Sequence, residues 1–172
     1  MLNYTLKAMV VAATLATAGL AQAGTINYTV DSGWDRFSAG AVGTTVNRKF
    51  SFSLTQNAIL SIVDGFVAGD RFEVFSNGAS IGMTSIPGTG PNTGMNFDAA
   101  LADGIHSMGQ FILGPGSYLI SLVVLSRSGT DTAGHIGAIR ADTAPVPVPA
   151  AGALLLSALG AVALRRRRRR EV

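Results

Sequence analysis

The sequence predicts an all-β chain folded as an antiparallel, jelly-roll-like β-sandwich, flanked by an N-terminal signal helix and a C-terminal transmembrane helix. Short apolar runs alternate with glycine-rich turns from residue 25 to residue 143. No stretch of that segment keeps a helical period for longer than about two turns. At least seven such runs in about 120 residues are typical of a sandwich.

The first half of the domain contains clear strand patterns. Polar and apolar residues alternate in several runs, as they do in half-buried strands. Asn77-Gly78 lies between two of these runs and indicates a tight hairpin, because both central residues of a type I′ turn need positive φ. The strands are expected at residues 49–54, 58–63, 71–75 and 80–84.

The second half begins with a long loop at residues 85–96, which is rich in glycine and proline. One helical turn is expected at 98–102, capped by Asn96 or Asp98. Gly114-Pro115-Gly116 then suggests a second hairpin. Its strands would be residues 111–113 and 118–125, the latter at the centre of the core, and a last strand is expected at 135–140.

The N-terminal residues have the three parts of a secretory signal peptide. Lys7 supplies the cation, residues 8–20 form an apolar run, and Ala21-Gln22-Ala23 places small residues at a cleavage site. We expect signal peptidase to cut between Ala23 and Gly24. Residues 1–23 are therefore interpreted as the signal peptide, and the β-sandwich domain is expected to span residues 24–143.

The C-terminal end has three consecutive segments. Residues 144–150 carry three alternating prolines, which exclude a helix and favour an extended linker. Residues 151–164 are uncharged and apolar, and they are interpreted as a short transmembrane helix. Residues 165–172 form a basic cytoplasmic tail by the positive-inside rule. Its stop-transfer cations are Arg165, Arg166, Arg167, Arg168, Arg169 and Arg170.

This C-terminal arrangement resembles the PEP-CTERM class of sorting signals. The motif residues are Val146, Pro147, Val148, Pro149 and Ala150, followed by the apolar segment and the arginines. They are similar to the variant that reads Val-Pro-Leu-Pro-Ala, with Val148 in place of leucine and without a Pro-Glu-Pro tripeptide. The resemblance implies a Gram-negative, exopolysaccharide-producing host, whose membrane-embedded exosortase recognises the proline motif and cleaves beside it.

The charge distribution argues against a nucleic-acid partner. The chain has a formal charge of +3, but six of its thirteen basic residues are the terminal arginines. Residues 24–143 carry six basic and nine acidic side chains, which gives −3. There is no cysteine, so disulfides and thiolate chemistry are excluded.

Residues 50–142 resemble an uncharacterised core found in other PEP-CTERM proteins. The resemblance rests on the segment from Val63 to Val74, on Asn77-Gly78 and on residues 98–103. It implies a secreted β domain without a known activity. We therefore expect no catalytic residues and no cofactor.

Two patterns suggest chemistry without fulfilling its requirements. Residues 78–82 match the G-x-S-x-G nucleophile pattern at Ser80, but that motif needs a strand-to-helix elbow. His106 and His135 lack the spacing of a zinc site. A Ser80 hydrolase using one of these histidines remains an alternative, to be abandoned if neither imidazole reaches the hydroxyl.

Two binding alternatives also stay open. Calcium, which takes oxygen ligands, has candidate ligands in Asp64, Asp70, Asp98 and Asp103, although aspartates in loops usually cap turns instead. A carbohydrate-binding face would use Trp34, Tyr28 and Tyr118, although aromatic residues usually pack in the core.

The leading interpretation is an exported, non-enzymatic surface or extracellular-matrix protein. As a precursor it would sit in the inner membrane, and signal peptidase and an exosortase would process it. It would then reach the cell surface or the medium, in association with exopolysaccharide. The alternative is a carbohydrate-binding module that acts on the same polysaccharide.

Overall fold

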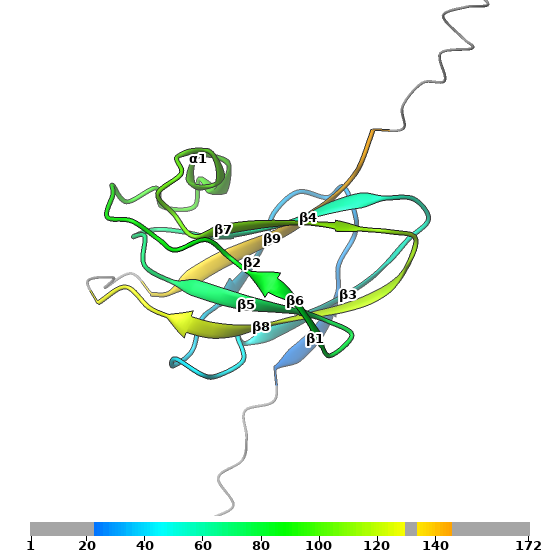
Figure 1. The fold of residues 1–172 in the computed structure, drawn as a ribbon, viewed down its shortest axis with the longest axis horizontal. Helices are drawn as coiled ribbons and strands as arrows, with labels where there is room; N and C mark the ends of the chain where they lie inside the picture. Colours follow the sequence, from blue (N-terminus) through cyan, green and yellow to red (C-terminus); the bar gives the residue numbers. More distant parts are fainter. Residues whose placement is uncertain (1–22, 130–133, 146–172) are drawn as a thin grey trace, which may run out of the picture.

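The computed structural model describes residues 23–129 and 134–145. Within these residues the chain forms nine strands and one helix (Figure 1). The elements are β1 (Gly24–Asn27), β2 (Asp35–Ser38), β3 (Arg48–Leu54), β4 (Ala58–Asp64), β5 (Arg71–Ser76), β6 (Ala79–Met83), α1 (Phe97–Ala102), β7 (Met108–Leu113), β8 (Gly116–Ser126) and β9 (Ile136–Thr143).

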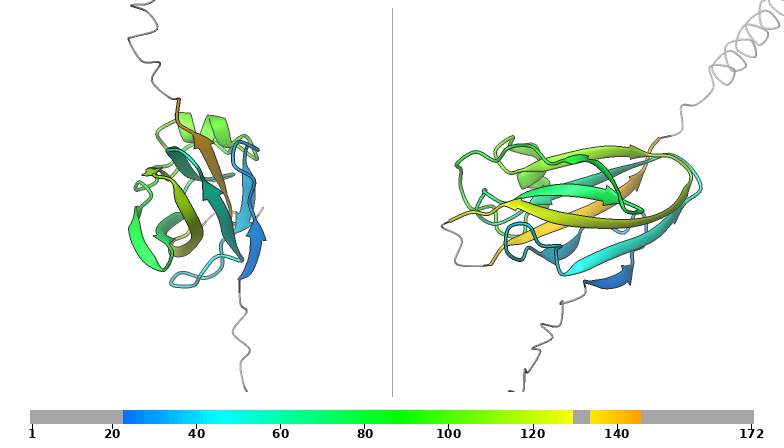
Figure 2. Two further views of the ribbon diagram at one scale, coloured as in Figure 1. Left: turned by 90° about the vertical axis from the view of Figure 1, so that its right-hand side faces the viewer. Right: turned by 60° about the horizontal axis from the view of Figure 1, so that its bottom comes forward.

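The strands form two sheets, and the predicted all-β sandwich is confirmed. One sheet has the order β1-β3-β8-β5-β6, and the other has the order β2-β9-β4-β7. The two layers are seen from further sides in Figure 2. All neighbours are antiparallel except β1 and β3, which are parallel. Without β1, the two four-stranded sheets have the strand order of a jelly roll.

The predicted hairpin at Asn77-Gly78 is confirmed. Both residues have positive φ, 50° and 86°, as a type I′ turn requires. The turn joins β5 to β6, which pair with each other. The Asn77 amide adds a link to β8, because its Nδ2 donates to the Ser117 carbonyl and its Oδ1 accepts from the Leu119 amide.

The predicted hairpin at residues 114–116 is wrong. β7 pairs with β4 in the four-stranded sheet, whereas β8 pairs with β3 and β5 in the other sheet. The connection is therefore an arch between the layers. A second arch, between β3 and β4, lies beside it, since Leu54 is opposite Gly116 and Ala58 is opposite Leu113. The same glycine and proline residues suit the turn of a hairpin and that of an arch. The two connections differ only in which strands pair with each other.

The main core fills the space between the sheets. Inward-facing residues of β8, namely Ile120, Leu122 and Val124, are fully buried, which confirms the expected central position of this strand. Beside them, Phe37 makes edge-to-face contacts with other buried rings, with centroid distances of 5.2 Å to Phe72 and 6.3 Å to Phe50. The largest side chains thus hold the layers together.

A smaller core lies outside the four-stranded sheet, where α1 covers one end of it (Figure 1). Val63 and Ala138 point out of that sheet and are buried under Phe97 and Ala100. The helix begins after Asn96, whose side-chain oxygen accepts from the Ala99 amide at 3.1 Å, so one of the two expected caps is confirmed.

The described chain begins beside β1 and ends beyond β9, on opposite sides of the sandwich (Figures 1 and 2). The predicted signal helix and the predicted transmembrane helix both lie outside the described residues. Within the described part of the chain, no helix has the length and apolar character needed to cross a bilayer.

Candidate functional site

A cluster of ionisable side chains surrounds residues 65–69, at the end of the sandwich that carries α1. Both histidines of the chain lie here, and each contacts an aspartate. The segment connects β4 to β5 and takes an unusual backbone path, with φ of 57° at Phe66 and 155° at Gly69. A side chain at Gly69 would place its Cβ 2.6 Å from the Ser128 Cα, so glycine is required at this close approach.

Asp64 and Asp70 form a buried pair at the two ends of this segment. Asp64 is fully buried, and Asp70 is 1% exposed. The Oδ2 atom of Asp64 accepts hydrogen bonds from the amides of Gly69 and Asp70, both at 2.9 Å. The other oxygen, Oδ1, is buried without a hydrogen-bond partner. An ionised carboxylate is costly in such a position.

The second carboxyl group of the pair is tied to the strands β8 and β9. Asp70 Oδ1 accepts from the Ser128 amide at 2.8 Å, just after β8. His135, just before β9, places Nδ1 at 2.8 Å and 3.0 Å from the two oxygens of Asp70. The ring donates to the carboxylate when Nδ1 carries the hydrogen. Asp70 therefore connects the ends of three strands.

A second aspartate–histidine pair holds the other side of the segment. His106 is buried, and its Nδ1 lies 2.6 Å from Asp103 Oδ2. Its Nε2 lies 3.1 Å from the Phe66 carbonyl and 3.3 Å from Thr93 Oγ1. Because Phe66 also accepts from the Thr93 amide, the segment 65–69 and the long loop before α1 are joined at this point.

The two acidic groups that begin these networks have opposite pKa shifts. Burial and the nearby Asp70 carboxylate raise the pKa of Asp64 from 3.8 to about 8. For Asp103, burial favours the neutral form, but hydrogen bonds from the amides of His106 and Ile105 and from the His106 ring outweigh it and lower the pKa. Asp64 is thus mostly protonated at neutral pH, whereas Asp103 is ionised.

The four aspartates considered for calcium do not come together. Asp64 and Asp70 share one network, and Asp103 bonds to His106. Asp98 lies on α1, where its Oδ1 accepts from Trp34 Nε1 at 3.1 Å and from Arg140 at 2.7 Å. These two bonds, that of Trp34 first, lower the pKa of Asp98. Within residues 23–129 and 134–145, no three acidic or histidine side chains are arranged to hold a metal ion.

The Ser80 arrangement does not match a catalytic triad. Ser80 lies on β6, directly after a strand-to-strand turn, and its hydroxyl donates to Glu73 Oε1 at 2.7 Å. The imidazoles of His106 and His135 are bonded to their own aspartates, and neither bonds to Ser80. Neither imidazole therefore engages the Ser80 hydroxyl, and the hydrolase alternative is abandoned.

The three candidate aromatic residues do not form one face. Tyr28 is buried, and its hydroxyl donates to the Gly33 carbonyl while accepting from the Ala141 amide. Tyr118 stacks on Phe52 in the main core, with a centroid distance of 5.7 Å. A sugar-stacking surface made of these residues is therefore not present.

Trp34 lies in the smaller core, apart from the two tyrosines. Its ring is half-buried and packs against Phe97, with a centroid distance of 5.9 Å. The guanidinium of Arg140 lies 4.4 Å from the ring centroid, in a cation–π contact. The side chains of Phe97 and Arg140 thus already contact the indole ring, which weighs against stacking of a sugar on it.

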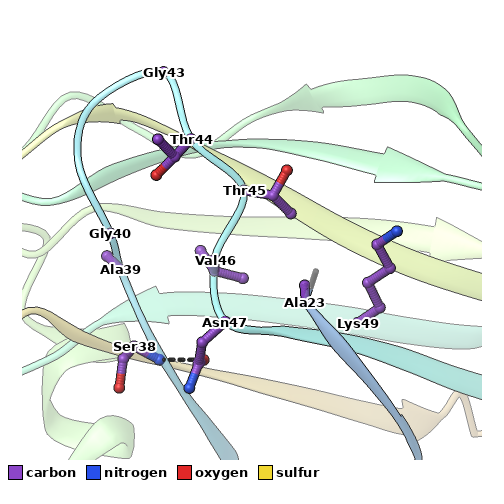
Figure 3. A pocket seen from close by; sticks show the side chains of 10 residues that line it. All are labelled: Ala23, Ser38, Ala39, Gly40, Gly43, Thr44, Thr45, Val46, Asn47 and Lys49. Atoms are coloured by element: carbon purple, nitrogen blue, oxygen red, sulfur yellow. Dashed lines mark hydrogen bonds between the residues drawn. The ribbon is translucent and has the colours of Figure 1, made fainter. Parts of the chain in front are cut away.

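An open hollow of about 760 Å³ lies beside residues 39–47 (Figure 3). The described residues that line it have mostly small or hydroxyl side chains, and Lys49 is the charged one among them. Ser38 and Asn47 close the base of the loop, through a bond of 2.8 Å from the Ser38 amide to Asn47 Oδ1. None of the described residues that line the hollow is aromatic or acidic, so they offer no stacking platform and no carboxylate ligand for a metal ion.

The sequence indicated several members of the cluster but not their partners. Asp64, Asp70 and Asp103 are among the aspartates that the sequence offers as calcium ligands. The contact between Asp70 and His135 joins residues that are 65 positions apart, and no local pattern signals it. The buried position of His106 likewise depends on two loops meeting.

The predicted sorting motif (residues 146–150), the basic run and the cleavage residue Ala21 lie outside the described residues. Of the residues at the predicted signal cleavage site, Ala23 borders the hollow and Gly24 begins β1. The Gly24 amide donates to the Asn47 carbonyl at 3.2 Å.

No protein-family model matches the chain, and no curated protein matches it. Among solved structures, the chain is similar to the pre-peptidase C-terminal domain of a collagenase from Bacillus anthracis. The two share 11% sequence identity, with a TM-score of 0.37, over 70% of this chain and 94% of that domain. The strand order of the chain itself defines a β-sandwich of the jelly-roll type.

Proposed function

We propose that this chain is an exported surface or extracellular-matrix protein without enzymatic activity, sorted through its C-terminal proline motif. Signal peptidase would remove residues 1–23, and an exosortase would act at residues 146–150. The mature product would be the acidic sandwich, retained in or released through an exopolysaccharide layer.

One observation carries the proposal: the described strands lie between the two predicted terminal signals. β1 begins at Gly24, directly after the predicted signal cleavage site, and β9 ends at Thr143, directly before the proline segment. The described ends are on opposite sides of the sandwich (Figure 1). Both cuts would leave every described strand intact.

The site geometry supports a non-enzymatic role. Asp64, Asp70 and His106 of the ionisable cluster are buried, and most of the cluster's polar atoms bond within the protein, which suits the anchoring of a loop better than catalysis. The Ser80 hydroxyl lacks a histidine partner. These arrangements favour a binding or structural domain over a hydrolase.

Mass spectrometry of the protein from an exosortase-containing host tests the proposal. The intact mass of the extracellular protein is expected to correspond to a chain that begins at Gly24 and ends within or beside residues 146–150. A variant with Pro147→Ala and Pro149→Ala alters the motif but leaves residues 24–143 unchanged, and it should remain cell-associated with an uncut C-terminus. Mature extracellular protein that still contains Leu164 and the terminal arginines would defeat the sorting assignment.

A further inference from the structure

We propose that the buried carboxyl pair of Asp64 and Asp70 binds one proton and acts as a pH-sensitive lock on residues 65–69. The lock is closed while the pair holds the proton, and it loosens when the proton is released. This property belongs to the folded sandwich and does not depend on how the chain is exported or sorted.

The geometry requires a proton for two reasons. Asp64 Oδ1 is buried without a partner, whereas Oδ2 of the same group already accepts two amides. The nearby carboxyl group of Asp70 accepts from the Ser128 amide and lies at hydrogen-bond distance from the His135 ring. Two charged carboxylates that lie near each other in a buried site repel each other, and one proton bound by the pair removes the repulsion.

Asp64 is surrounded by groups that come from the ends of β5, β7 and β9. The Ser107 carbonyl, before β7, accepts a hydrogen bond from the Asp64 amide. The Ile136 carbonyl of β9 accepts one from the Gly65 amide. His135 is the titratable group from the β9 side, and Asp70 is the one from the β5 side. The ionisable groups on the far side of the segment are His106, whose Nε2 contacts the Phe66 carbonyl, and its partner Asp103.

Opening of the segment would release several strand ends together. Gly69 and Asp70 donate their amides to Asp64, and the Gly69 carbonyl accepts from Ser126 Oγ at 3.1 Å. When Asp64 ionises, its charge favours hydration, and hydration requires these contacts to separate. The affected region is the loop end of the sandwich, and the main core between the sheets is not involved.

The direction of the pH effect follows from linkage. The pKa of Asp64 is about 8 in the closed state, against 3.8 for an ordinary aspartate in water. Between these values the closed state keeps the proton and the opened state loses it. Each rise of one pH unit therefore increases the equilibrium constant for opening by up to tenfold. The increase levels off above pH 8, where Asp64 is ionised in both states.

Amide exchange in the purified full-length chain tests the lock. In the wild type, the protection factors of the Gly69 and Asp70 amides should fall at least tenfold between pH 6 and pH 8. In Asp64→Asn, which keeps a side-chain oxygen for both amides and cannot ionise, they should stay constant within about twofold. Asp98→Asn, which removes an exposed carboxylate, is the matched control and should follow the wild type. Equal pH profiles for the wild type and Asp64→Asn would overturn the proposal.

Infrared spectroscopy supplies a second readout, which does not depend on loop opening. The wild type should show the carbonyl stretch of a protonated carboxylic acid at pH 6, and this band should disappear as the pH rises through 8. The band should be absent in Asp64→Asn and present in Asp98→Asn. A wild-type spectrum without the band at pH 6 would show that the pair holds no proton, and would refute the proposal even if Asp64→Asn failed to fold.

Discussion

Substitution of Asp31 tests how the folded domain holds the end that precedes the proline segment. The Asp31 carboxylate accepts from the Thr143 amide at 2.8 Å and from Thr143 Oγ1 at 3.1 Å. Asp31 itself has a φ of 62°, a left-handed conformation that aspartate tolerates better than alanine. We therefore predict that Asp31→Ala loses both the hydrogen bonds and a favourable backbone fit.

The expected loss combines two modest contributions. The contact is exposed, so its hydrogen bonds contribute about 1 kcal/mol net. Placing alanine in a left-handed conformation costs about 1 kcal/mol more. The sum, about 2 kcal/mol, is a considerable part of the roughly 5–15 kcal/mol that stabilises a typical domain.

Urea unfolding measures this loss directly. With an m-value of about 2 kcal/mol per molar, a 2 kcal/mol loss lowers the midpoint by about 1 M. Asp31→Asn keeps one side-chain acceptor and tolerates the same φ, so it should lose less than half as much. The reasoning is refuted if Asp31→Ala unfolds within about 0.2 M of the wild type, or if the asparagine variant loses as much as the alanine variant.

Two further substitutions test the packing around the candidate site. Gly69→Ala would place a Cβ 2.6 Å from the Ser128 backbone at a φ of 155°, so a loss of at least about 2 kcal/mol is expected in the same unfolding assay. Gly24→Ala, which meets no atom within 4 Å, is the control and should stay within about 0.5 kcal/mol of the wild type. Arg140→Met removes the cation above Trp34, and we expect a loss of about 1 kcal/mol with a changed tryptophan emission spectrum. An unchanged spectrum would contradict the contact between the guanidinium and the ring.

Local patterns predicted most strands well because the alternation of polar and apolar residues along a strand reflects which side chains face the core. The alternation of residues 49–54 appears in β3, where Phe50, Phe52 and Leu54 face the core. Asn77-Gly78 forms its hairpin because the two residues themselves tolerate the required positive φ. Such features depend only on residues that are close in the chain, so they can be predicted from the sequence alone.

The arch between β7 and β8 could not be predicted in this way. Gly114-Pro115-Gly116 permits a reversal of the chain, but it does not specify which sheet receives the next strand. That choice depends on pairing of β7 with β4 and of β8 with β3 and β5, which joins segments far apart in the chain. The same limit applies to the carbohydrate alternative, since packing distributes Tyr28 and Trp34 between two different cores.

By itself, the sequence determined the all-β class, the positions of most strands and the Asn77-Gly78 turn. Those properties follow from side-chain polarity and backbone preference over a few neighbouring residues. Only the tertiary structure decided which strands share a sheet, and that both histidines meet aspartates around residues 65–69. The unpartnered Asp64 oxygen is likewise a tertiary property, because burial and the approach of Asp70 arise only when distant strand ends meet.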